Sequence, residues 1–160
     1  MVYLEPRRRV AVLVSLLDDP VRAVRIEAAR ALTSVPRAAL DEQQAARFDA
    51  VLAELFEAEL ASLDLPGANL NLGVLHSRTG DQAAAETAYL RALDFDPDFA
   101  PARFNLANLL NRQGRNEEAE VVLRAGLERV PDDGELHYSL GLLLAEEQRF
   151  EEAAASLGRA

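Results

Sequence analysis

Alternating aspartates in the stretch DFDPDF, residues 94–99, have the spacing in this chain that most suggests a metal site. A calcium-binding loop begins in this way, but it also needs a glycine at its sixth position and a glutamate at its twelfth. Counted from Asp94, those positions hold Phe99 and Asn105. Pro97 also stiffens a segment that would have to wrap around an ion. The aspartates are therefore predicted to end one helix and to cap the next.

No other group of residues has a spacing that predicts catalysis, which needs polar groups that converge in a pocket. The only histidines, His76 and His137, are far apart in the sequence and do not have the spacing of a ligand pair. Cysteine is absent, which excludes disulfides, thiolate metal sites, cysteine nucleophiles and CxxCH haem attachment within this chain. The glutamate pairs at 117–118 and 151–152 occupy equivalent positions of an internal repeat, so they belong to that repeat. The sequence predicts no enzyme, no cofactor and no metal.

Composition narrows the possible partners. The chain has 160 residues, is 49% hydrophobic, contains no tryptophan and carries a net charge of −10. Residues 1–40 are net +3, with seven arginines against four acids, whereas 41–65 are net −6 and 66–160 are net −7. An acidic body repels phosphate, so nucleic acid is not an expected partner. The run Arg7-Arg8-Arg9 is predicted to be a solvated helix face.

No apolar run is long enough for a spanning helix, which needs about 18 residues or more, so membrane insertion is not expected. The N-terminus enters a helical pattern without the layout of a signal peptide. These features do not separate a cytoplasmic from a periplasmic location.

An internal repeat with a period of about 34 residues organises the second part of the chain. The segments at 68–80, 102–114 and 136–148 align, and the segments that follow them align as well. Small residues share one column (Gly73, Ala107, Gly141) and large residues share another (Tyr89, Leu123, Leu157). Such columns let two helices approach closely and pack. Gly80 and Gly114 are predicted to end the first helix of each repeat, and Pro97 and Pro131 the second.

These columns resemble the tetratricopeptide repeat, whose N-L-G run is matched by Asn71-Leu72-Gly73. The resemblance covers residues 66–160 as repeats 66–99, 100–133 and 134–160, or about 2.8 repeats. It implies an all-α, right-handed helical solenoid of antiparallel helix pairs. Two departures stand out. Polar residues (Asn69, Arg103, His137) replace the family's tryptophan, which is expected to weaken packing, and Gln148 occupies the column of Gly80 and Gly114. Phe95 and Phe99 are expected to pack between repeats.

Residues 7–36 have another pattern. The turn Leu16-Leu17-Asp18-Asp19, then Val24-Arg25 and the run AARAL at 28–32, resemble one HEAT-like repeat, in which Asp19 and Arg25 would be hydrogen-bonded. A long helix is predicted over 41–64, capped by Asp41, with an apolar stripe that packs on the first tetratricopeptide helix (Phe48, Val51, Leu52, Leu55, Leu60). The expected domains are a HEAT-like pair at 1–40, a bridging helix at 41–65 and the repeats at 66–160. Both ends are expected to be cut from a longer protein.

In this family the first helix of each repeat lines a concave groove, which the resemblance implies is the binding site. The groove residues expected from the register are Leu70, Asn71, Val74, Arg78, Phe104, Asn105, Asn108, Asn111, Arg112, Tyr138, Ser139 and Leu142. Asn71 and Asn105 are one repeat apart and could read a peptide backbone, or they could be ordinary family consensus. Phe104 and Tyr138 are the stronger candidates, because exposed aromatics are enriched where partners bind. Leu70, Glu135 and Ser139 replace the basic residues of a carboxylate clamp, so chaperone C-terminal tails are not expected ligands.

The resulting hypothesis is a non-catalytic module that binds a peptide or protein segment in this groove. The alternative is an accessory domain of a larger exported multihaem cytochrome or other multidomain enzyme, with no cofactor in this segment. CxxCH motifs before residue 1 would favour the alternative. RNA binding is a third hypothesis, and the net charge argues against it. Weak homodimers are also expected through the last helix, where Ala154, Leu157 and Leu143 or Leu144 are predicted to be partly uncovered.

Overall fold

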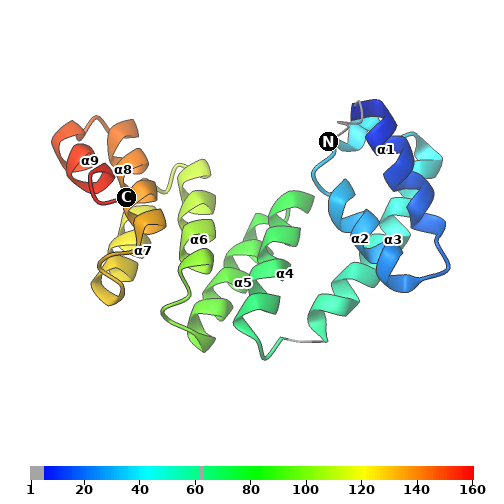
Figure 1. Ribbon diagram of the computed structural model, residues 1–160, viewed down its shortest axis with the longest axis horizontal. Coiled ribbons are helices and arrows are strands. Elements are labelled where there is room, and N and C mark those ends of the chain that lie inside the picture. Colours follow the sequence, from blue (N-terminus) through cyan, green and yellow to red (C-terminus); the bar gives the residue numbers. More distant parts are fainter. Residues whose placement is uncertain (1–5, 62) are drawn as a thin grey trace. The chain divides into compact units, whose positions relative to one another are not determined.

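The computed structural model describes residues 6–61 and 63–160, and all regular structure among them is helical (Figure 1). The chain forms two compact units, residues 1–62 and 63–160. No helix in the described part of the chain is both long and apolar enough to cross a membrane.

The described part of the first unit contains three α-helices and two short 3₁₀ segments around its own core. Its elements are α1 (Pro6–Ser15), η1 (Leu16–Asp18), α2 (Arg22–Leu32), η2 (Arg37–Ala39) and α3 (Glu42–Leu60). Asp41 caps α3 as predicted, because its carboxylate accepts from Gln44 N and the Gln44 side chain accepts from Asp41 N. The buried core takes residues from all three helices and from η1 (Val14, Leu17, Ala28, Ala29, Leu32, Phe48, Val51).

Two expectations for this unit need correction. Leu60 is about half exposed (51%), because it is the last residue of α3 and lies beyond the buried stripe. The Asp19–Arg25 hydrogen bond forms, but Arg25 Nη1 donates to the backbone oxygen of Asp19 (2.9 Å). The Asp19 carboxylate instead accepts from Val21 N, and the ionic partner of Arg25 is Glu54 on α3 (2.7 Å). Arg8 and Arg9 are exposed as expected, and the side chain of Arg7 lies outside the described residues.

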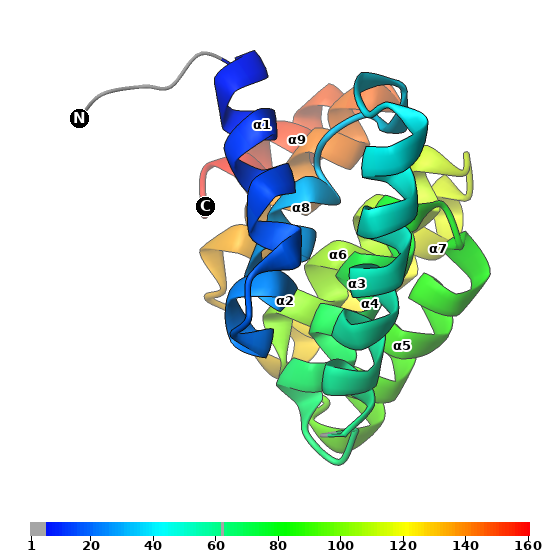
Figure 2. The same cartoon turned by 90° about the vertical axis from the view of Figure 1, so that its right-hand side faces the viewer.

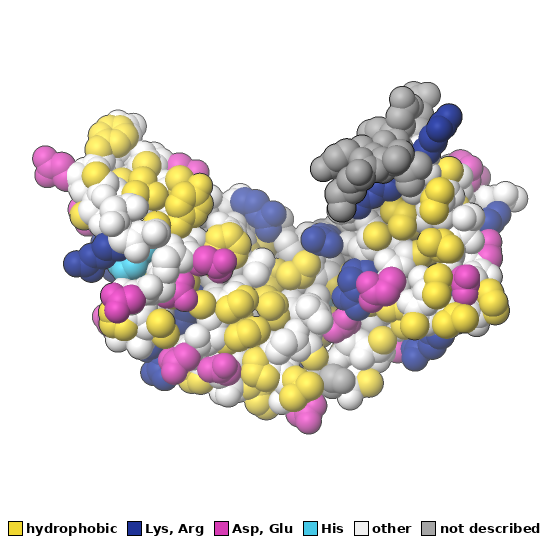
Figure 3. All heavy atoms as spheres, in the orientation of Figure 1, with side chains coloured by type: hydrophobic (Ala, Val, Ile, Leu, Met, Phe, Trp, Pro, Cys, Tyr) yellow, Lys and Arg dark blue, Asp and Glu magenta, His cyan; other side chains and the backbone are white. Residues whose placement is uncertain are grey.

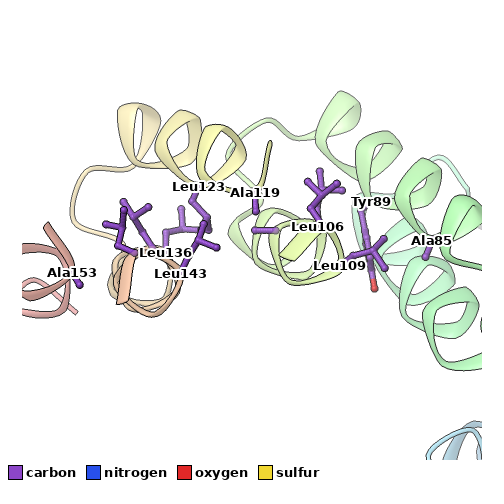
Figure 4. Close-up of a cluster of buried hydrophobic side chains, with 13 residues drawn as sticks. Ala85, Tyr89, Leu106, Leu109, Ala119, Leu123, Leu136, Leu143 and Ala153 are labelled. Carbon is purple, nitrogen blue, oxygen red and sulfur yellow. The ribbon is translucent and has the colours of Figure 1, made fainter. Parts of the chain in front are cut away.

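The second unit is a solenoid of three helix pairs, seen from two sides in Figures 1 and 2. The first helices of the pairs are α4 (Pro66–Thr79), α6 (Ala100–Arg112) and α8 (Gly134–Glu146). The second helices are α5 (Gln82–Phe95), α7 (Asn116–Arg129) and α9 (Phe150–Leu157). Consecutive helices pack together, and α6 also packs on α4 and α8. One buried cluster runs through the pairs, from Ala85 and Tyr89 to Ala153 (Figure 4).

The two helices of each repeat approach closely, as the columns predict, and the structure pairs the small column with the large one. A Cβ atom added to Gly73 would overlap the ring of Tyr89, and one added to Gly141 would lie 2.6 Å from Leu157 Cγ. The helices of these pairs therefore approach too closely for any side chain at the glycine. The middle repeat uses Ala107 and the smaller Leu123, both buried.

The turn between the two helices of each repeat places one residue in the left-handed region. Gly80 (φ 93°) and Gly114 (φ 75°) adopt it, as predicted, and so does Gln148 (φ 63°). Glycine adopts this conformation without steric cost, whereas a residue with a Cβ does not. The third repeat therefore carries local strain that the other two avoid.

The three polar residues that stand where the family usually has tryptophan share a structural role. Asn69 Nδ2, Arg103 Nη2 and His137 Nε2 each bond the backbone carbonyl oxygen six residues earlier, at 2.8 Å in all three cases. A carbonyl only accepts, so His137 Nε2 carries the hydrogen. Asn69 and His137 are buried. The expected loss of packing is thus accompanied by a hydrogen bond that ties the connecting loop to each first helix.

The stretch DFDPDF joins α5 to α6, and its aspartates stabilise the connection rather than cap α6. The Asp96 carboxylate accepts from Asp98 N (3.0 Å), and the Asp98 carboxylate pairs with Arg129. Phe99 is the N-cap residue of α6, so the predicted aspartate cap is wrong. Phe95 is 48% exposed, contrary to the expected packing between repeats, because α5 ends at this residue. Within the described residues, no cluster of three or more His, Asp or Glu side chains is placed to hold a metal ion.

The last helix leaves less apolar surface uncovered than predicted. Leu143 and Leu144 are buried, because α8 packs against α6, α7 and α9. Ala154 is exposed, and Leu157 is 39% exposed. Homodimer formation through α9 stays a prediction that rests on these two residues.

Candidate peptide-binding site

The first helices present predicted groove residues at helical spacing. Phe104, Asn108 and Asn111 follow one another at i, i+4 and i+7 along α6, so they share a face. Tyr138 and Leu142 on α8 occupy the columns of Phe104 and Asn108, one repeat later. The face that these residues form lies within the second unit.

A pocket of about 150 Å³ opens between α6, α7 and α8. We call it the first-helix pocket; its lining is Phe104, Ala107, Asn108, Asn111, Ala119, Leu123, Tyr138, Ser139, Leu142, Leu143 and Glu146. Six of these eleven residues were predicted as groove residues (Phe104, Asn108, Asn111, Tyr138, Ser139, Leu142). Tyr138 and Leu142 are 52% and 44% exposed, so apolar surface faces solvent at the entrance.

The first-helix pocket also has polar lining residues on α6 and α8. Asn111 Nδ2 donates to Glu146 Oε2 at 2.8 Å, which bridges α6 and α8. The side chain of Asn108 is exposed and makes no hydrogen bond to the described residues. Glu146 is the only charged side chain in the lining. The site therefore offers amide and carboxylate groups beside an apolar surface.

The expectation that the column of Asn71 and Asn105 reads a peptide backbone is weakened by hydrogen bonds within the helices. Asn105 Nδ2 donates to Pro101 O (2.7 Å), and Ser139 Oγ in the same column donates to Glu135 O (2.8 Å). Ser139 is also buried. These groups already have partners on their own helices, so they are poorly placed to read a ligand backbone. Asn71, the first member of the column, is exposed.

The remaining predicted residues lie outside the lining of the first-helix pocket. Leu70 and Val74 on α4 are partly buried against the core. Arg112 Nη2 donates to Ser77 Oγ at 3.0 Å, which connects α6 to α4. Arg78 is exposed on the last turn of α4.

Sequence reasoning missed two features. Glu146 was not predicted, although it occupies the column of Arg112 and follows Leu142 by one helical turn. The second is a groove of about 440 Å³ between α5, α6 and α7, which we call the second-helix groove. Its lining is Glu86, Leu90, Leu106, Leu110, Arg115, Glu117, Glu118, Val121 and Val122. Figure 3 shows hydrophobic side chains at the surface over α5 and α6, with acidic side chains close by.

A family model of the tetratricopeptide repeat matches residues 78–143, which confirms the resemblance to this repeat. A crystal structure of MamA protein superposes with a TM-score of 0.59 at 16% identity, over 95% of this chain and 90% of that chain. A second crystal structure of MamA gives 0.59 at 14% identity, over 99% and 94%. Residues 41 to the end of MamA from Desulfovibrio magneticus RS-1 give 0.53 at 18% identity, over 94% and 73%. At these identities the likeness shows the fold. Comparison with curated proteins finds no match.

Proposed function

We propose that the tetratricopeptide repeats of this chain bind a partner protein through an extended segment, whose apolar side chain enters the first-helix pocket. The module is non-catalytic in this proposal. The observation that carries it is the exposure of Tyr138 and Leu142 at the mouth of a pocket that also contains Phe104. Repeat solenoids use extended surfaces of this kind for binding.

The size of the first-helix pocket supports one apolar side chain as its occupant. Its volume is only about 150 Å³, and its lining includes the apolar residues Phe104, Leu123 and Leu142. Burying a leucine or phenylalanine side chain there contributes roughly 1.5–3 kcal/mol. Aromatic lining residues add contact area, which makes Phe104 and Tyr138 the expected energetic centre.

The polar lining residues of the pocket support recognition of a main chain. Asn108 has no partner in the described residues, so its amide can both donate to and accept from a ligand peptide group. Its net contribution is about 0.5–1.5 kcal/mol, because each new bond replaces a bond to water. Aromatic contacts are therefore expected to contribute more than the asparagines, and the ligand is expected to require an apolar residue.

A peptide-library screen against the 160-residue chain, followed by titration of a selected peptide, tests this proposal. Phe104→Ala is expected to weaken binding by about 2 kcal/mol, or roughly 30-fold. Asn108→Ala is expected to weaken it less, and Asn105→Ala least, because the Asn105 amide already bonds Pro101. Phe150→Ala is the matched control, since Phe150 is 66% exposed and lies outside the pocket. Parent-like binding by both Phe104→Ala and Asn108→Ala would overturn the proposal.

A further inference from the structure

The second-helix groove lies apart from the first-helix pocket, and the two share no lining residue. Five of its residues are aliphatic, and two of these are exposed: Leu90 by 47% and Val121 by 68%. We infer that the second-helix groove docks a segment of a partner protein that presents aliphatic side chains next to arginine or lysine. Three observations carry this inference.

The first observation is a comparison with the next junction of the same solenoid. Arg124 occupies the column of Leu90 one repeat later, and Ala155 occupies that of Val121. Arg124 bonds Glu120 on its own helix (2.7 Å) and Glu152 on α9 (3.2 Å), so it bridges the second helices at that junction. The repeat fold thus does not require exposed aliphatic residues in these columns. Grouped apolar residues on a surface mark interaction sites.

The second observation is the charge around the groove. Its lining holds three glutamates (Glu86, Glu117, Glu118) and one arginine, so the net charge of the lining is −2. Arg115 bonds both Glu86 (2.6 Å) and Glu118 (2.7 Å), so its charge is shared between two carboxylates. Glu117 makes no ion pair within the described part of the chain. Complementarity therefore favours a basic partner segment.

The third observation is the size of the groove. At about 440 Å³ it is nearly three times the volume of the first-helix pocket. It therefore has room for more than one aliphatic side chain, over a floor formed by Leu106 and Leu110 of α6. An anionic lipid surface is disfavoured, because the glutamates at the rim would repel it.

The next repeat supplies a substitution that puts a charge in the groove and narrows it without disturbing the fold. There Arg124 and Ala155 replace Leu90 and Val121, and the equivalent groove measures about 240 Å³. Leu90→Arg places a guanidinium between Glu86 and Glu118, the counterparts of Glu120 and Glu152. Because the same arrangement exists one repeat later, the melting midpoint of this variant is expected to equal or exceed that of the parent. A failure to bind would then not reflect unfolding.

The test uses two immobilised arrays of synthetic dodecapeptides and the full 160-residue chain. One array combines leucine and valine with arginine and lysine, and in the other glutamate and aspartate replace the basic residues. The basic array is expected to yield binders, and Leu90→Arg is expected to weaken them at least about tenfold. Phe104→Ala in the first-helix pocket is the control and is expected to leave this binding unchanged.

Three outcomes would overturn the inference. The basic array could yield no binders, the acidic array could bind equally well, or Leu90→Arg could bind the selected peptide as the parent does. A fourth outcome that would overturn it comes from sedimentation velocity. If the parent forms a dimer and Leu90→Arg is a monomer, the occupant of the groove is a second copy of this chain. Loss of the first-helix ligand in Phe104→Ala alone would leave the second-helix groove unaffected, so the two sites are tested separately.

Discussion

Both units of the chain join neighbouring helices by Arg–Glu pairs with the same sequence separation, |i−j| = 29, but they arrange the pairs differently. In the first unit, Arg25–Glu54 and Arg30–Glu59 both connect α2 to α3. In the second unit, Glu86–Arg115 connects α5 to the start of α7, and Glu120–Arg149 makes the same connection one repeat later. The pairs of the first unit lie side by side on one helix pair, whereas those of the second recur along the solenoid.

In the second unit, the N-cap position of the second helix has one of two structural roles, which depend on the residue that occupies it. Arg115 and Arg149 are the N-cap residues of α7 and α9, and neither caps its helix with a side-chain hydrogen bond. Asp81 occupies the same column in the first repeat, and its carboxylate accepts from Ala84 N (3.0 Å). Aspartate therefore stabilises its own helix at this position, while arginine ties its helix to the repeat before it.

The largest expected effect tests whether the close packing at Gly73 in the first repeat is repeated at Gly141 in the third. Gly73→Leu is expected to destabilise this unit by roughly 1–3 kcal/mol, because the side chain would overlap Tyr89. Gly141→Leu should have a similar effect through Leu157. Gly67→Leu is the control, since a Cβ there meets nothing within 4 Å. Urea unfolding followed by circular dichroism measures all three, and an unchanged midpoint for Gly73→Leu would show that the register is wrong.

The next effect concerns the ion pairs of the first unit. Glu59→Gln is expected to cost about 1–2 kcal/mol, because the Glu59 side chain is only 8% exposed where it bonds Arg30. Glu27→Gln is the comparison, since Glu27 bonds the same arginine from a side chain that is 68% exposed. It is expected to cost less than about 0.5 kcal/mol. Equal costs in thermal melts would mean that burial does not separate the two pairs.

A smaller effect is expected at the strained turn of the third repeat. Gln148→Gly should stabilise the chain by roughly 0.5–1 kcal/mol, because glycine adopts the left-handed conformation freely. The reverse change in the second repeat, Gly114→Gln, should destabilise it by a similar amount, since no atom lies within 4 Å of a Cβ at Gly114 and only the backbone conformation opposes the change. Differential scanning calorimetry compares the two. A loss of stability in Gln148→Gly would indicate that the glutamine side chain makes compensating contacts.

The smallest effect is a pH dependence that the recurring pairs confer. The hydrogen bond from Arg149 lowers the pKa of Glu120 and of Glu152 below the ordinary value of 4.5. The unfolded chain therefore binds protons more readily. This stabilisation is fully present above the ordinary pKa of 4.5 and is lost as the pH falls below it, through the lowered pKa values of the folded chain. Arg149→Gln should reduce the loss of stability on acidification. Melts of parent and variant across this range that fall in parallel would count against the role of the pair.

Particular residues show how far sequence reasoning reached into the fold and the site. Gly80, Gly114 and Asp41 were predictable, because left-handed turns and helix caps depend on a few neighbouring residues. The close approach of two helices at Gly73 followed from the repeat columns, whereas its partner Tyr89 was identified only by the structure. Phe95 was wrongly placed, because a residue at a helix end can point away from the next repeat. Asn105 was weighed as a ligand-binding group, although its amide bonds its own helix at Pro101.

The sequence by itself determined the all-helical architecture and the repeat of the second unit. It could do so because helix periodicity, small and large columns and turn residues are local properties that repeat along the chain. Only the tertiary structure decided which surfaces stay open, including the first-helix pocket and the second-helix groove. A side chain in this column can stay exposed, as Leu90 does, or bridge two helices by ion pairs, as Arg124 does, and the outcome depends on the helices of two repeats together. The physical reason is that Leu90 and Val121 come from successive repeats and line one groove only after the helices have packed. No local sequence pattern specifies that packing.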